Sequence, residues 1–103
     1  MSNTRNNQTI RVIKKSNNVD TQVEKFILNL TRDAINRNFD DYYGLSSFIR
    51  DTICAKYSSQ WFVSVGESQH YCTSWGMSKS RKFLLFEIAN IKLTIGEIGG
   101  WLW

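Results

Sequence analysis

Proline is absent from the chain, and no apolar stretch comes near the roughly 20 residues that a membrane-spanning helix needs. Cysteine is scarce, since Cys54 and Cys72 are the only two. A disulfide framework is therefore not expected, and both thiols are expected to be free. The polar amino terminus also lacks the apolar stretch of a secretory signal. These absences favour a soluble intracellular protein with no membrane partner.

The chain does contain enough apolar residues for one small domain. Of its 103 residues, 42% are hydrophobic and 14% aromatic, the composition of a folded protein. Residues 1–8 are polar and are predicted to form a disordered tail. The folded domain is predicted to span residues 9–98, with an aromatic C-terminal extension at 99–103. The net charge of +4 comes from scattered basic residues, which favours solubility over nucleic-acid binding.

Residues 21–36 show the apolar period of an amphipathic helix. Either Asp20 or Thr21 can cap its start, and Thr21 with Glu24 matches a capping box. After a break, a second amphipathic helix is predicted over residues 45–57. The apolar stripes consist of Val23, Ile27, Leu30 and Ala34 in the first helix and Leu45, Phe48, Ile49, Ile53 and Tyr57 in the second.

Extended segments rich in β-branched and aromatic residues lie before and after the two helices. They cover residues 9–15, 61–66, 69–75, 83–88 and 91–97. This order predicts an α+β fold, in which an N-terminal strand and two amphipathic helices pack on an antiparallel sheet. Alternation along the last two strands predicts which face the helices cover. Leu84, Phe86, Ile88, Ile91, Leu93 and Ile95 are expected under the helices, and Lys92, Thr94 and Gly96 on a semi-polar opposite face.

No pattern in the chain predicts a catalytic residue, a cofactor or a metal site, so an enzyme is not expected. His70 and Cys72 share one face of a strand, but neither an orienting group nor a cleft accompanies them. One histidine and two distant cysteines do not provide the ligand spacing of a zinc site. Asp40 and Asp41 precede the second helix and are interpreted as helix caps.

Two groups of aromatic residues have more than one interpretation. The first stands beside basic residues and could stack nucleic-acid bases, but no recognised signature accompanies it, and the basic run is interpreted as a solvated loop. Its members are Trp61, Tyr71, Trp75, Lys79, Arg81 and Lys82. The second group, Trp101 and Trp103, would pack either against the chain's own sheet or against a neighbouring subunit.

The second helix and the segments KYSSQWFVSVGESQHYCTSW and KFLLFEIANIKLTIGEIGG share their order of residues with a known family. The shared residues are Tyr57, Trp61, Gly66, Phe83, Leu84 and Gly99. On these residues the chain resembles the dynein light-chain hub family. The resemblance implies a strand-exchanged dimer, in which residues 69–75 cross to the sheet of the other protomer and partner peptides add to that edge. Without proline or charge, this segment would be prone to aggregation if its edge were left bare.

The resemblance also implies partners and a location. The chain would form a homodimer, or a heterodimer with a paralogous light chain. It would bind the dynein intermediate chain and other dynein subunits in the cytoplasm and cytoskeleton, with a cilium or flagellum axoneme as one setting. The alternative is a general dimerising hub that binds peptides of non-motor proteins.

Particular residues acquire roles from this resemblance. Peptide binding is implied for Gln69, His70, Tyr71, Cys72, Thr73, Ser74, Trp75, Phe83, Leu85 and Tyr43. The dimer interface is implied for Trp61, Phe62, Tyr71 and Thr73. Phe62 stands where the family has a titratable histidine, so the acid-triggered dissociation of the family is not expected. Ile98 replaces a phosphorylated serine, and Tyr43 replaces a basic residue that grips a glutamine of the partner.

Overall fold

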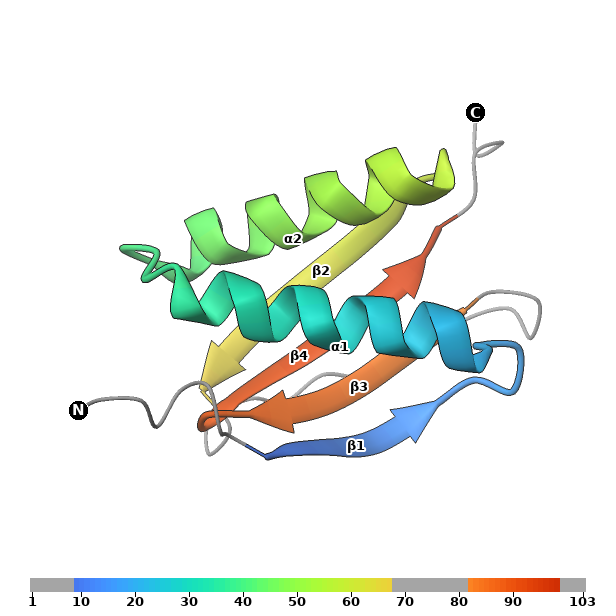
Figure 1. Cartoon of the computed structure of the whole chain (residues 1–103), viewed down its shortest axis with the longest axis horizontal. Coiled ribbons are helices and arrows are strands. Elements are labelled where there is room, and N and C mark those ends of the chain that lie inside the picture. The colour runs from blue at the N-terminus through green and yellow to red at the C-terminus, as the bar shows by residue number, and fades with distance from the viewer. Residues whose placement is uncertain (1–8, 68–81, 99–103) are drawn as a thin grey trace.

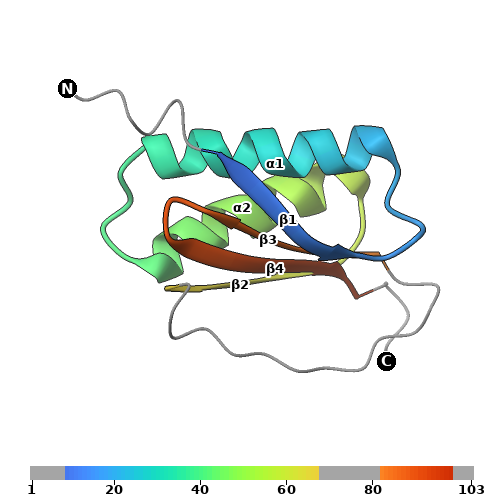
Figure 2. The same cartoon turned by 90° about the horizontal axis from the view of Figure 1, so that it is seen from below.

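The structure is a computed structural model, and it describes residues 9–67 and 82–98. Two helices lie on one face of a four-stranded antiparallel sheet whose strand order is β1-β3-β4-β2 (Figures 1 and 2). In chain order the elements are β1 (Ile10–Lys15), α1 (Thr21–Asn36), α2 (Tyr42–Tyr57), β2 (Trp61–Glu67), β3 (Phe83–Ile88) and β4 (Ile91–Glu97). The predicted α+β fold is thereby confirmed. The tail at 1–8, the strand at 69–75 and the extension at 99–103 lie outside the described residues.

Helix α1 begins at the predicted place, with one of the two predicted caps. The carboxylate of Asp20 accepts a hydrogen bond from the backbone N–H of Val23 at 2.9 Å. The capping box expected from Thr21 and Glu24 is wrong, because Thr21 already lies within the helix. The Glu24 carboxylate instead accepts a hydrogen bond from the ammonium group of Lys15 at 2.7 Å, which connects the helix to the end of β1.

One position of the α1 stripe differs from the prediction. Val23, Ile27 and Ala34 are buried as expected, but Leu30 is only partly buried and the neighbouring Thr31 is fully buried. The hydroxyl of Thr31 donates to the carbonyl oxygen of Ile27 at 2.9 Å. A buried threonine is therefore tolerated here, because its polar atom has a partner within the helix.

Helix α2 starts earlier than the predicted Leu45. The Asp41 carboxylate accepts a hydrogen bond from the backbone N–H of Gly44 at 2.8 Å, so Asp41 caps a helix that begins at Tyr42. The helix ends at Ser58, whose φ of 54° is left-handed and whose N–H donates to the carbonyl of Cys54 at 2.9 Å. Of the two adjacent acids interpreted as caps, only Asp41 has that role.

The core lies between the helices and the covered face of the sheet. The predicted inward residues of β3, and Leu93 and Ile95 of β4, are buried against Ile49 and Ile53 of α2 and Ile27 of α1. Ile91 is only partly buried, since it stands at the turn end of β4. The opposite face is less polar and less open than predicted, because Thr94 and Gly96 are also buried there.

A two-residue turn connects β3 to β4. Ala89 and Asn90 both have positive φ, 56° and 64°, as a type I′ hairpin turn requires. Asparagine tolerates the left-handed region, whereas the Cβ of alanine is strained there. The turn therefore keeps the hairpin in register at some cost in stability.

Replacing Ala89 by glycine should relieve this strain. We expect A89G to raise the free energy of unfolding by about 0.5–1 kcal/mol, since the gain from removing Cβ exceeds the added entropy of the unfolded chain. Ala55, an exposed residue within α2, provides the matched control, and A55G should lower stability by about 1 kcal/mol. Urea denaturation of both variants measures the two effects. Equal losses in A89G and A55G would contradict the strain at the turn.

Candidate functional site

The two outer strands of the described sheet differ in how they meet solvent. Strand β1 is short, and its sequence, IRVIKK, carries three basic residues. Its pairing with β3 is irregular between Val12 and Lys14. Arg11 also reaches across to Glu87, with 2.7 Å between the guanidinium nitrogen and the carboxylate oxygen. Charge and a bulge are the usual features that prevent a further strand from pairing, so β1 is a protected edge.

Strand β2 has none of these protections. Its sequence, WFVSVGE, has no basic residue and no proline, and Glu67, its only charged residue, comes last. It pairs with β4 in unbroken register from Trp61 opposite Glu97 to Glu67 opposite Ile91. No other described strand lies on its outer side. Within the described residues, β2 is thus a regular, nearly uncharged edge.

The hydrogen bonds beside β2 fix which of its backbone groups point outward. The N–H of Ile98 donates to the carbonyl of Gln60 at 2.7 Å, and on the other side of β4 the N–H of Glu97 donates to the carbonyl of Lys82 at 2.8 Å. Backbone bonds alternate along an antiparallel strand, so even-numbered residues of β4 face β2 and odd-numbered ones face β3. The backbone groups of Phe62, Ser64 and Gly66 accordingly face β4. Those of Trp61, Val63, Val65 and Glu67 face outward.

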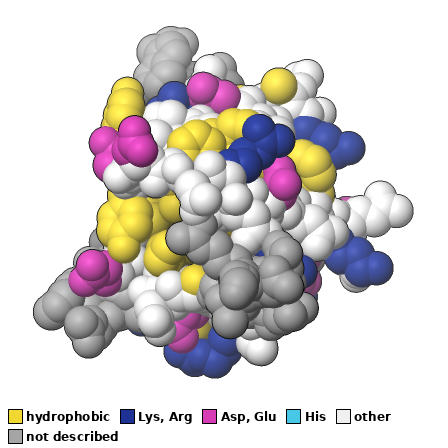
Figure 3. Space-filling view, turned by 60° about the vertical axis from the view of Figure 1, so that its left-hand side comes forward, with side chains coloured by type: hydrophobic (Ala, Val, Ile, Leu, Met, Phe, Trp, Pro, Cys, Tyr) yellow, Lys and Arg dark blue, Asp and Glu magenta, His cyan; other side chains and the backbone are white. Residues whose placement is uncertain are grey.

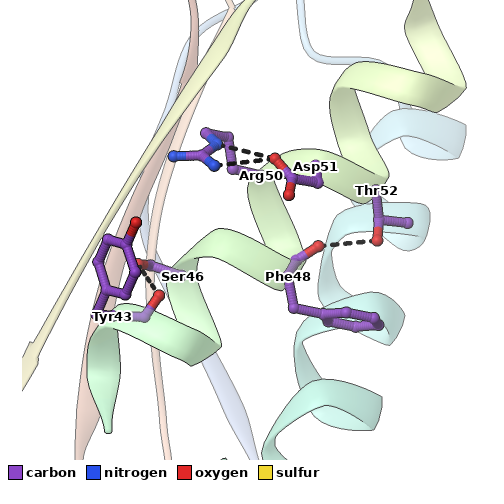
Figure 4. Close-up of polar contacts among 6 residues, drawn as sticks. All are labelled: Tyr43, Ser46, Phe48, Arg50, Asp51 and Thr52. Atoms are coloured by element: carbon purple, nitrogen blue, oxygen red, sulfur yellow. Dashed lines mark hydrogen bonds and ion pairs between the residues drawn. The ribbon is translucent and has the colours of Figure 1, made fainter.

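Helix α2 lies over β2 and has one flank facing away from α1 (Figure 1). Tyr43 and Arg50 lie on that flank, whereas Phe48 points toward α1 (Figure 4). Tyr43 is 77% exposed, the highest value among the exposed large hydrophobic residues of the described chain. The Arg50 guanidinium is bound to the adjacent Asp51 at 3.0 Å. A polypeptide paired with β2 would therefore pass along a flank that presents an aromatic ring and an ion pair.

The sheet face opposite the helices brings together three of the residues implied by the resemblance. Across the strands, Phe62 stands opposite Gly96, which stands opposite Phe83, and Leu85 lies beside this row opposite Thr94. The Phe62 ring occupies the space above Gly96, where an added Cβ would lie 2.4 Å from its Cε1 atom. Phe62, Phe83 and Leu85 are all half-buried. All three side chains lie on the sheet face opposite the helices, as alternation along the strands requires.

Trp61 was assigned to the dimer interface, but its side chain lies on the helix side of the sheet. It is 4% exposed, and its indole N–H donates to the hydroxyl of Ser59 at 2.8 Å. Its ring contacts that of Tyr57, with 5.8 Å between centroids. Burial, and then the nearby Asp20 carboxylate, raise the pKa of Tyr57 above 10.0, so this phenol stays neutral at physiological pH. Any contact of Trp61 with a partner strand would run through its backbone.

The remaining assigned residues, Gln69 to Trp75, lie outside the described residues, so their grouping with Phe83 and Leu85 stays a prediction. Tyr43 lies on the α2 flank, apart from the sheet face opposite the helices, which carries those two residues. Sequence reasoning did not single out the edge of β2. The available signal was the contrast between an uncharged WFVSV and a basic IRVIKK, which are the two sheet edges only once the strand order is known.

The described part of the chain shows no group of three or more histidine, cysteine or acidic residues placed to hold a metal ion. Neither α1 nor α2 is long and apolar enough to cross a membrane. No family model and no curated protein matches the sequence. The features of the chain that bear on function are therefore the geometry of the β2 edge and the resemblance noted above.

The contact between Phe62 and Gly96 can be tested by a double-mutant cycle. G96A should destabilise the fold by about 1–3 kcal/mol, because the new methyl group displaces the Phe62 ring. In F62A/G96A the ring is absent, so the loss should be clearly smaller than the sum of the two single losses. Thermal or urea unfolding of the four proteins gives the coupling energy. Additivity within about 0.5 kcal/mol would contradict the packing described.

Proposed function

We propose that the chain is a non-catalytic adaptor that captures an extended polypeptide as an added strand on the outer side of β2. The observation that carries this proposal is the difference between the two sheet edges. One is basic and bulged, and the other is regular, nearly uncharged and bordered by no described strand. An unprotected, nearly uncharged edge strand pairs readily with a strand of another chain. Proteins that retain such an edge use it to bind peptides.

The outward backbone groups supply most of the interaction. Trp61, Val63, Val65 and Glu67 each offer one N–H and one C=O in a straight ladder. Each hydrogen bond formed contributes about 1 kcal/mol net, so one strand gives moderate affinity that depends little on sequence. Selectivity would come from side chains beside the ladder, including Tyr43 and Arg50 on the α2 flank.

A finer proposal follows the resemblance to dynein light chains. The strand that pairs with β2 would be residues 69–75 of a second copy or of a paralogue, which completes a strand-exchanged dimer. Phe62, Phe83 and Leu85, on the sheet face opposite the helices, would then lie near the exchanged segments. The dimer would pair segments of the dynein intermediate chain, beside other dynein subunits, in the cytoplasm and cytoskeleton or an axoneme. Two linked sites would gain affinity from effective concentration.

The alternation of backbone groups along β2 gives a sharp test by amide hydrogen exchange. In the isolated monomer the N–H groups of Ser64 and Gly66 should be protected and those of Val63 and Val65 should exchange fast, because only the first pair faces β4. With rising protein concentration or added partner, Val63 and Val65 should become protected as well. Protection of all four in a monomer verified by native mass spectrometry would contradict strand capture.

Replacing Val65 by proline tests the same outward backbone groups by mutation. V65P removes an outward N–H and should weaken association about fivefold or more. V65A also removes the valine side chain but keeps the backbone N–H, so this variant should associate normally. S64P removes an N–H that faces β4 and should destabilise the monomer itself. Sedimentation or native mass spectrometry reports association, and circular dichroism verifies folding. Equal association of V65P and V65A would count against the β2 ladder.

The dynein assignment requires a separate measurement. Affinity purification of the tagged chain from extract of its own cells should recover dynein intermediate and heavy chains. V65P should lose them, and V65A should retain them. Recovery of non-motor proteins alone, through the same V65P-sensitive edge, would favour the general dimerising hub and overturn the motor assignment while leaving strand capture intact.

A further inference from the structure

A cavity of about 510 Å³ opens at one end of the fold. It lies between the connection from α1 to α2 and the turn from β3 to β4, which meet at the same end of the molecule (Figure 1). Both walls are described residues, held by the Asp41 cap on one side and by the Ala89-Asn90 turn on the other. The strand-capture edge does not use this cavity, and no role implied by the resemblance falls on it.

The lining of the cavity is partly aromatic. Phe39 and Tyr42 are 37% and 40% exposed, and the deeper wall is formed by Leu45 and Ile91. The Phe39 ring is held by Phe48, with 5.4 Å between the ring centroids. Figure 3 looks toward this end and shows hydrophobic and acidic side chains next to each other on the surface. Such a wall suits a flat or elongated apolar group that carries a charge at its tip.

The charge of the lining is of one sign. Among the described residues that line it, Asp40 and Asp41 are the charged ones, and none is a lysine, arginine or histidine, although the whole chain carries +4. Asp41 is occupied in capping α2. Asp40, in contrast, makes no hydrogen bond or ion pair with any described residue. A carboxylate beside exposed aromatic rings, without a cation of its own, is complementary to an incoming cation.

We infer that this cavity is a binding site for an arginine side chain of a partner polypeptide. Guanidinium groups stack on aromatic faces and bind carboxylates in a planar, bidentate manner, whereas the lysine ammonium is a strongly hydrated point charge. The neighbouring Arg37 already places its guanidinium carbon 4.8 Å from the centroid of the Phe48 ring, so this surface supports such stacking. Asp40 supplies the countercharge, and Phe39 and Tyr42 supply the aromatic walls.

The position of the cavity identifies the source of the arginine, and this source rests on the proposed capture of a strand by β2. Ile91, in the cavity wall, is paired with Glu67, the last residue of β2. A polypeptide that leaves the β2 edge at Glu67 therefore passes within a few residues of the cavity. An arginine a few residues beyond the end of the added strand would therefore anchor in the cavity.

The test uses the full chain labelled with ¹⁵N and a minimal probe, N-acetylarginine amide. Titration should shift the amide resonances of residues 38–45 and 89–91. N-acetylcitrulline amide, which has nearly the same shape without the charge, should shift them at least about threefold less at equal concentration. Equal shifts from arginine and citrulline, or shifts spread evenly over the surface, would overturn the inference.

A pair of matched variants tests whether Asp40 supplies the negative charge that binds the arginine probe. D40N should raise the Kd for the arginine probe about threefold to fivefold, whereas D51N, a change of the same kind on the exposed surface of α2, should leave it unchanged. Asp41 is left intact because it caps the helix. F39L should weaken binding of the arginine probe and also lower its preference over citrulline, because the Phe39 ring attracts the charged guanidinium group. Equal binding by D40N and D51N would exclude the cavity as the arginine site, whether or not β2 captures strands.

Discussion

The antiparallel pairing of β2 with β4 determines which backbone groups of β2 point away from the rest of the described sheet. Because Ile98 bonds to Gln60 and Glu97 bonds to Lys82, β4 divides its hydrogen bonds strictly between its two neighbours. The odd-numbered residues of β2 are left facing outward, while their side chains pack under α2. Packing of these side chains in the core thus determines which backbone groups of β2 face outward. A shift of one residue in the register of β2 would turn the core side chains to the other face and would also exchange the inward and outward backbone groups.

The two outer strands of the described sheet, β1 and β2, differ in their protection against pairing with a further strand. On β1, Arg11 and Lys14 carry charge across a bulged pairing, and Arg11 forms an ion pair with Glu87 of β3. Surface ion pairs contribute little to stability. The main effect of the Arg11–Glu87 pair is therefore to hinder another strand from pairing with β1. The sequence of β2 has no basic residue and its register with β4 is unbroken, and on the sheet face opposite the helices the Phe62 ring is seated over Gly96.

Much of this arrangement could be predicted from residue patterns, because local rules and tertiary packing agree. The strands at 83–88 and 91–97, their inward residues and the cap at Asp20 follow from alternation, turn length and capping chemistry. The departures occur where a tertiary contact replaces a local one. Glu24 binds Lys15 instead of closing a capping box, and Thr31 is buried where Leu30 was expected. Neither contact has a signal in the local sequence.

The functional features were harder to predict because they depend on strand order and on approach of distant segments. Only the order β1-β3-β4-β2 makes WFVSVGE an edge, and only the hairpin turn brings Ala89 and Asn90 to the Phe39–Tyr42 connection. A fold of this class serves many functions, so the architecture alone does not select one. The selection proposed above comes from asymmetry: among the described residues, one edge is closed by charge and the other is bordered by no further strand. A regular, nearly uncharged edge of this kind pairs readily with another strand, which is the physical basis for proposing strand capture.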